Sequence, residues 1–143
     1  MTSMRVPLFE VDMGQGVYHG NYFHLFETAR DNFFRDIGYP YKSLMAEHLH
    51  FAIARIVCTY RASLTYDDII KIHTGVSRWR KRSMEMFQKI YREDKEEKPV
   101  LCTEATFNMV CVRFTGGSTS LPPELVKCLE IWADKDADSV RIL

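Results

Sequence analysis

The chain has 143 residues, the length of a single domain, and 46% of them are apolar, which predicts a packed core. Its 19 Lys and Arg residues balance its 19 Asp and Glu residues, so no net charge favours nucleic acid or an anionic membrane as a partner. The N-terminus lacks the apolar stretch of a signal peptide, and no apolar run is long enough to span a membrane. We therefore expect one domain over residues 1–143 of a cytoplasmic protein.

The N-terminal segment predicts a strand followed by a tight turn. Residues 4–11 have strand composition, and Pro7 within them indicates a sheet edge or a bulge, because proline cannot donate a hydrogen bond to a ladder. The glycine-containing residues 13–16 then predict the turn.

One long helix is predicted after this turn. Over residues 21–36 the apolar side chains recur at helical spacing, and they are numerous enough to be buried on more than one side of the helix. Asn21 is expected to cap the helix, and Gly38 with Pro40 is expected to end it. A loop or short helix follows over residues 41–50.

The rest of the chain predicts long strands joined by turns. The first of them alternates imperfectly between apolar and polar residues, as expected of a strand covered on both faces for part of its length. The strands are expected over residues 51–63, 69–80, 83–93 and 101–114, with a charged hairpin tip at 93–99, a turn at 115–118 and a C-terminal amphipathic helix at 122–133.

These elements predict an α+β architecture. Strands joined only by turns form an antiparallel meander, and the helix at 21–36 is the large element available to cover one face of the sheet. An open sheet of long strands leaves long edges, and pairing with a second copy of the chain would cover them.

A short motif between the first strand and the helix is the strongest functional signal. The run VDMGQGVYHGNY (11–22) places a carboxylate, a glycine turn and a helix start within a few residues of one another. It resembles the signature of the hot-dog-fold acyl-CoA thioesterases related to 4-hydroxybenzoyl-CoA thioesterase, most closely the Tol–Pal-associated branch. The residues that match this pattern in spacing are Glu10, Asp12, Val17, Tyr18, His19, Asn21 and Tyr22.

The resemblance covers nearly the whole chain. Further matches are LFETAR (25–30), LTYDDI (64–69) and LPPEL (121–125). The sequence departs from the pattern at Val11, where the family has threonine, and in the order of the glycines in the turn.

This resemblance implies a hot-dog fold, in which roughly five antiparallel strands wrap one long helix, and it implies a thioester hydrolase. In the family, the aspartate at the position of Asp12 carries the hydrolysis, and the backbone N–H at the position of His19 polarises the thioester carbonyl. Physical chemistry agrees, because hydrolysis builds negative charge on the carbonyl oxygen and free N–H groups at a helix N-terminus stabilise such charge. Asp12 would either attack the carbonyl carbon or deprotonate a water, and both routes stay open.

Each site residue also has a structural interpretation. Asp12 alone would be expected to form an Asx-turn with the glycines. The His19 imidazole is a catalytic candidate that orients Asp12 or lines the pocket, and Tyr18 is a second candidate that fits a core position as well. Asn21 is both a helix cap and a candidate substrate contact. Glu27 is expected to be structural, because Asp12 supplies the acid.

A basic corner, which we define as residues 77–83 (SRWRKRS), follows the second long strand. Its functional interpretation is a clamp for the phosphates of coenzyme A or of a carrier protein's pantetheine arm, because arginine forks suit phosphate. The substrate-binding candidates there are Arg78, Lys81, Arg82 and Ser83. The alternative is a solvated hairpin tip.

Other reactive residue types predict no further site. The four cysteines lack C-x-x-C spacing and are expected to be reduced structural thiols, as in the cytosol. No histidine recurs with other ligands at metal spacing, so neither a metal site nor a redox cofactor is predicted. Coenzyme A or phosphopantetheine would enter only as part of the substrate.

The expected function is hydrolysis of an acyl-CoA by a homodimer or homotetramer with active sites at the subunit interface. A thioesterase that serves an acyl carrier protein in a polyketide or polyunsaturated fatty acid pathway is the enzymatic alternative. A non-catalytic acyl-CoA-binding dimer is the alternative from a different class.

Overall fold

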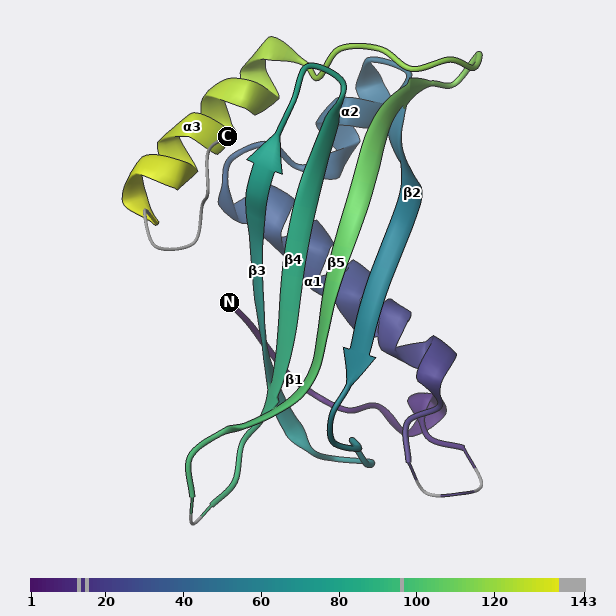
Figure 1. The fold of residues 1–143 in the computed structure, drawn as a ribbon, viewed down its shortest axis with the longest axis vertical. Coiled ribbons are helices and arrows are strands. Elements are labelled where there is room, and N and C mark those ends of the chain that lie inside the picture. Colours follow the sequence, from purple (N-terminus) through teal and green to yellow (C-terminus); the bar gives the residue numbers. More distant parts are fainter. Residues whose placement is uncertain (13, 15, 96, 137–143) are drawn as a thin grey trace.

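The computed structural model describes residues 1–12, 14, 16–95 and 97–136, and these form a curved antiparallel sheet crossed by a long helix (Figure 1). The strands are β1 (Thr2–Arg5), β2 (Leu49–Tyr60), β3 (Ile69–Trp79), β4 (Ser83–Arg92) and β5 (Val100–Arg113). The helices are α1 (Tyr22–Asp36), α2 (Tyr41–Ala46) and α3 (Pro123–Lys135), with the short 3-10 helices η1 (Leu8–Glu10) and η2 (His19–Asn21) before α1. This arrangement is the predicted α+β class.

The strand order differs from the predicted meander. The order is β1-β3-β4-β5-β2, so only β3, β4 and β5 follow one another, and β2 pairs with β5 instead of β3. The connection from β2 to β3, residues 61–68, is longer than an ordinary hairpin turn and leads the chain away from its neighbour in sequence. The two edge strands are therefore β1 and β2.

The first strand is shorter than predicted. It ends at Arg5, and residues 8–10 form η1, so the predicted strand over 4–11 is wrong beyond its first residues. Pro7 immediately precedes η1 with a φ of −69° and has no N–H for a ladder, which explains why the strand stops before it. Residues 13 and 15 of the predicted turn and residue 96 of the predicted hairpin tip lie outside the described residues.

The core lies between α1 and one face of the sheet. The buried side of the helix follows the predicted spacing and consists of Tyr22, Leu25, Phe26, Ala29, Phe33 and Phe34. In β4 and β5 buried residues alternate with partly exposed ones, so these strands bury one face only. No helix in the described part of the chain is long and apolar enough to cross a membrane.

Strand β2 departs from the predicted burial. We expect it to be covered on both faces for part of its length, but residues 53–57 are exposed in succession. The register against β5 shifts between Ile53 and Arg55, and this bulge explains the imperfect alternation of apolar and polar residues. Ile53, Ile56 and Val57 remain at least 39% exposed at this edge.

A polar network inside the core links α1 to the sheet. Gln88 of β4 is fully buried, and its Nε2 donates to the Phe26 carbonyl and to Thr74 Oγ1, each at 3.0 Å. Its Oε1 accepts from Arg30 Nη1 at 3.0 Å, and the Arg30 guanidinium carbon lies 4.4 Å from the centroid of the Phe107 ring. The side chain thus satisfies its own amide while it fixes the helix over the sheet.

We predict that Gln88→Leu lowers the free energy of unfolding by about 1–3 kcal/mol, because the substitution leaves buried partners without hydrogen bonds. Urea unfolding followed by circular dichroism measures the change. The matched control is Lys89→Leu, on the opposite face of the same strand, where we expect a change within about 0.5 kcal/mol. Equal stability of wild type and Gln88→Leu would contradict a role for this network.

Candidate active site

Backbone hydrogen bonds join the Asp12 loop, of which residues 11, 12, 14, 16 and 17 are described, to the segment after β2. Within the loop, Asp12 N donates to the Gly16 carbonyl at 3.1 Å. Val17 N donates to the Leu64 carbonyl at 2.9 Å, and Gly16 forms a bridge with Thr65. The loop therefore lies where the chain enters α1, at the end of the molecule where β2 finishes (Figure 1).

The Asp12 side chain is exposed and held at one oxygen. Its Oδ1 accepts a hydrogen bond from Gly14 N at 2.8 Å, which is the Asx-turn expected of this residue. A Cβ at Gly14 would stand 3.1 Å from the same oxygen, so glycine permits this close approach. Oδ2 has no hydrogen-bond partner among the described residues.

His19 is the first residue of η2, which continues into α1. The first N–H groups of a helix have no partner within the helix, and no described residue supplies an acceptor for the His19 N–H. The His19 carbonyl accepts from the Tyr60 hydroxyl at 3.0 Å. The imidazole makes no hydrogen bond to any described residue and lies between two aromatic rings, with centroids 6.3 Å from Tyr18 and 4.7 Å from Tyr60.

Tyr60 is a site residue that the sequence interpretation missed. It ends β2, and besides its contacts with His19 it packs edge-on against Tyr22 at 5.1 Å. Burial is the main cause that raises the pKa of Tyr60 to about 12, and the neighbouring Cys58 raises it further. The phenol is therefore a hydrogen-bond donor throughout the neutral range. Only the pairing of distant segments places it beside His19, so no local pattern could have indicated it.

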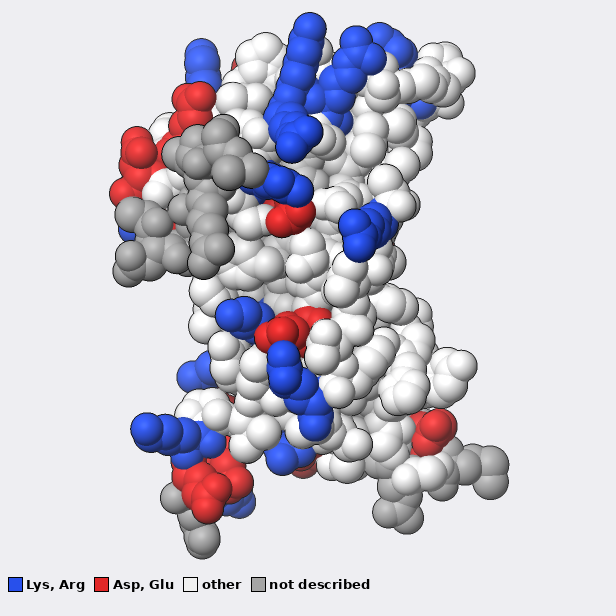
Figure 2. All heavy atoms as spheres, viewed as in Figure 1, with Lys and Arg blue, Asp and Glu red and all other residues white. Residues whose placement is uncertain are grey.

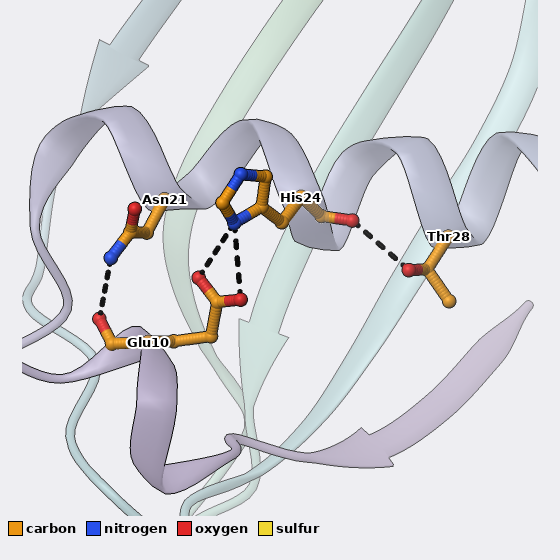
Figure 3. A network of polar contacts seen from close by, with 4 residues as sticks. All are labelled: Glu10, Asn21, His24 and Thr28. Carbon is orange, nitrogen blue, oxygen red and sulfur yellow. Dashed lines mark hydrogen bonds and ion pairs between the residues drawn. The ribbon is translucent and has the colours of Figure 1, made fainter.

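A second unpredicted feature joins η1 to α1 (Figure 3). The Glu10 carboxylate is 2% exposed, and both of its oxygens lie 3.1 Å from Nδ1 of His24. The Glu10 carbonyl accepts from Asn21 Nδ2 at 3.1 Å. Glu10 matches the family pattern, but no local pattern indicates its pairing with His24.

The predicted side-chain cap by Asn21 is wrong. Asn21 makes no side-chain capping hydrogen bond, because its backbone is already helical, with φ −75° and ψ −17°, rather than extended as a capping residue requires. Its amide reaches back to Glu10 instead. Its predicted contact with substrate stays a prediction.

The two tyrosines of the motif lie in different environments. Tyr18 is 60% exposed, so its interpretation as a core residue is wrong, and it stays a catalytic candidate. Tyr22 is buried, its hydroxyl accepts from Leu64 N at 3.2 Å, and burial raises its pKa. Glu27 is exposed and lines a pocket of about 270 Å³ with Arg30, and no contact joins it to Asp12.

The basic corner lies at the opposite end of the molecule from the Asp12 loop. Ser83 pairs with Val110, which pairs with Ala52 near the start of β2, whereas His19 contacts Tyr60 at its end. At about 3.3 Å per residue, the strand from Ala52 to Tyr60 extends roughly 25 Å. Lys and Arg side chains gather at the β3–β4 end in Figure 2.

Two predicted arginines of the basic corner already have partners within the chain. Arg78 forms an ion pair with Glu85 at 3.1 Å, and Arg82 Nη1 donates to Ser118 Oγ at 3.2 Å. Ser83 and Arg78 line a pocket of about 230 Å³ at this end.

Within the described residues, no group of three His, Cys, Asp or Glu side chains is arranged to hold a metal ion.

Comparison with known proteins identifies one family. Residues 6–129 match the model of the Thioesterase-like superfamily. The chain is 30% identical over 109 residues to the acyl-CoA thioester hydrolase YbgC of Escherichia coli, which covers 76% of this chain and 78% of that protein.

Solved structures give the same fold. The DHNA-CoA thioesterase from Staphylococcus aureus aligns with a TM-score of 0.86 and 20% identity, over 99% of this chain and 96% of that one. The 4-hydroxybenzoyl-CoA thioesterase from Pseudomonas sp. strain CBS-3 aligns with a TM-score of 0.80 and 19% identity, over 89% of this chain and 96% of that one. These similarities confirm the predicted hot-dog fold.

The family model covers most of the chain, and a relative of the same family matches over three quarters of it. The narrower placement in the Tol–Pal-associated branch stays a prediction. The chain therefore belongs to the thioesterase-like superfamily, in agreement with the predicted enzyme class, a thioester hydrolase.

Proposed function

We propose that this chain hydrolyses acyl-CoA thioesters to a free acid and coenzyme A, with Asp12 as the catalytic carboxylate. The observation that carries the proposal is an exposed carboxylate a few residues before a helix start whose first N–H has no acceptor among the described residues. Asp12 has one oxygen without a partner among the described residues, and the His19 N–H a few residues later has no acceptor there. The relative named acyl-CoA thioester hydrolase supports the substrate class.

The chemistry follows from these two groups. The thioester carbonyl oxygen would accept the His19 N–H, which stabilises the negative charge that develops there, and one such donor contributes about 10²–10³ in rate. Asp12 Oδ2 would attack the carbonyl carbon and expel the thiolate, after which water cleaves the mixed anhydride. Alternatively, Oδ2 would take a proton from the attacking water. Both routes consume one water and need no group other than the substrate.

A homodimer formed through β2 would complete the site. β2 is an edge strand whose apolar side chains Ile53, Ile56 and Val57 are exposed, so its backbone and side chains both lack a covering partner in the single chain. Two-fold pairing of antiparallel β2 strands would bring the start of one strand beside the end of its partner. The basic corner of one protomer would then lie near the Asp12 loop of the other.

This arrangement gives the basic corner a function that it could not have within one protomer. Lys81 and Arg82 are exposed cations roughly 25 Å along the strand direction from their own Asp12 loop. Across the dimer they would be placed to contact the phosphates of coenzyme A. The same cations would suit the phosphopantetheine arm of a carrier protein, which is the second candidate substrate.

We predict that Asp12→Asn lowers kcat for acyl-CoA by about 10²–10⁴, the usual loss when a catalytic acid–base group is removed. Thiol release from a panel of aliphatic and aromatic acyl-CoAs measures the rate. Asp36→Asn removes another exposed carboxylate, at the end of α1, and should leave the rate unchanged. Equal turnover by wild type and Asp12→Asn would contradict the proposed role. Binding of acyl-CoA without turnover by wild type would favour the non-catalytic alternative.

We predict that the active site is shared between protomers. Asp12→Asn protein mixed with an equal amount of Lys81→Gln/Arg82→Gln protein, after subunit exchange, should recover about a quarter of wild-type activity at low acyl-CoA concentration, because half of the dimers then hold one intact site of two. Each parent protein alone should stay nearly inactive under the same conditions. No recovery after verified exchange would contradict the shared site.

We predict that Tyr60 keeps its proton well above the pH at which the enzyme works. The phenol has a pKa of 10.0 in the unfolded chain, and folding raises the pKa of Tyr60 to about 12. The folded state therefore binds the proton more tightly, so the free energy of unfolding should fall as the pH rises through this range. Tyr60→Phe should lose less stability than wild type between pH 10 and 12, as measured by urea unfolding. Parallel losses in both proteins would argue against this assignment.

A further inference from the structure

We propose that His24 is a positioning residue for Asp12 and acts through the buried carboxylate of Glu10. This inference rests on the proposed function, since it names the residues that hold the catalytic carboxylate in place. The interaction joins η1, which precedes Asp12 by two residues, to the first turns of α1.

The exposed His24 side chain contacts both oxygens of the Glu10 carboxylate. Both Glu10 oxygens lie 3.1 Å from the same nitrogen, His24 Nδ1, and an ionised carboxylate accepts a hydrogen bond from Nδ1 in the tautomer that carries its hydrogen there. The other ring nitrogen of His24 points away from Glu10 in Figure 3. No other described side chain bonds the Glu10 carboxylate, which is 2% exposed. The carboxylate therefore depends on His24 for its charge-assisted hydrogen bond.

The main chain of Glu10 is held at the same time. Its carbonyl accepts from Asn21 Nδ2 at 3.1 Å, and its N–H donates to the Pro7 carbonyl at 3.1 Å. Glu10 is thus fixed at its side chain by one residue of α1 and at its carbonyl by the residue that precedes α1. Val11, which follows, forms a bridge with Val17, and Asp12 comes next. Little freedom is left between the anchored Glu10 and the catalytic carboxylate.

The start of the helix carries both the His19 N–H donor and His24, the residue that contacts Glu10. The His19 N–H belongs to the turn that leads into α1, and His24 lies one turn further along. The contact between His24 of α1 and Glu10 therefore sets the distance between the Asp12 carboxylate and the His19 N–H. A displacement of about 1 Å in such a pair can cost about 10² in rate.

The test uses His24→Ala, which removes the donor but suits a helix, and His24→Asn, whose amide nitrogen lies at the same distance along the side chain as Nδ1. We expect His24→Ala to lower kcat by about 10–10² with KM within about twofold, and His24→Asn to regain much of the loss. The matched control is Thr28→Ala, one turn later, whose hydroxyl donates only to the His24 carbonyl and not to Glu10. It should leave kcat unchanged.

Two further measurements separate positioning from a general structural effect. In the Asp12→Asn background, His24→Ala should not lower the residual rate further, because the positioned group is already absent. Hydrogen exchange of the Asp12 and Val17 amides should be faster in His24→Ala than in wild type, since both amides are bonded within or beside the loop.

The outcomes distinguish this inference from the proposed function. Unchanged exchange of the Asp12 amide in His24→Ala, or an equal fall of kcat in the wild-type and Asp12→Asn backgrounds, overturns the positioning role. Full activity of Asp12→Asn alone overturns the proposed function, and faster exchange in His24→Ala would still establish that His24 holds the loop. If His24→Ala does not fold, Glu10→Gln, which weakens the same contact from the other side, takes its place. A lower kcat with faster exchange of the Asp12 amide supports the positioning role, and an unchanged kcat and exchange overturn it.

Discussion

The packing of α1 on the sheet is the interaction on which the candidate site depends. The apolar side of the helix sits on β3, β4 and β5, and Gln88 joins the helix backbone and Arg30 to the centre of that surface. With its middle fixed in this way, the helix can start at only one place relative to the end of β2. The position of the His19 N–H is therefore set by the core and not by the loop that precedes it.

Around that helix start, some polar groups have hydrogen-bond partners among the described residues and others do not. The carbonyls of Glu10 and His19 receive donors from Asn21 and Tyr60, and one oxygen of Asp12 receives Gly14 N–H. Among the described residues, Asp12 Oδ2 and the His19 N–H have no partner, and these are the two groups to which the proposed function assigns the reaction. A site whose donors are already oriented loses no free energy to reorganisation when charge develops, which is the basis of electrostatic preorganisation.

Sequence patterns gave the elements whose signals are local. The helix at 21–36 was found from its spacing, since every buried residue of α1 repeats at the helical period, and the long strands were found from their composition. The strand pairing of β2 was missed, because hairpin reasoning assigns a strand to its neighbour in sequence. Tyr60 and His24 were missed for a related reason: each acts on a residue distant along the chain. The family motif indicated Asp12 and His19, but the Asn21 cap failed because η2 had already begun the helix.

The exposed edge of β2 has a consequence for the solubility of the single chain. A strand of 12 residues with successive apolar side chains and one open edge is a template for uncontrolled pairing with other chains. Arg55 is the one Lys, Arg, Asp or Glu within β2, and it stands at the bulge, in the middle of this apolar stretch. A lone charge at a kinked position acts against such pairing, because a growing stack of strands would have to bury it. The feature that gives the strand its irregular pattern therefore also protects its exposed edge against aggregation.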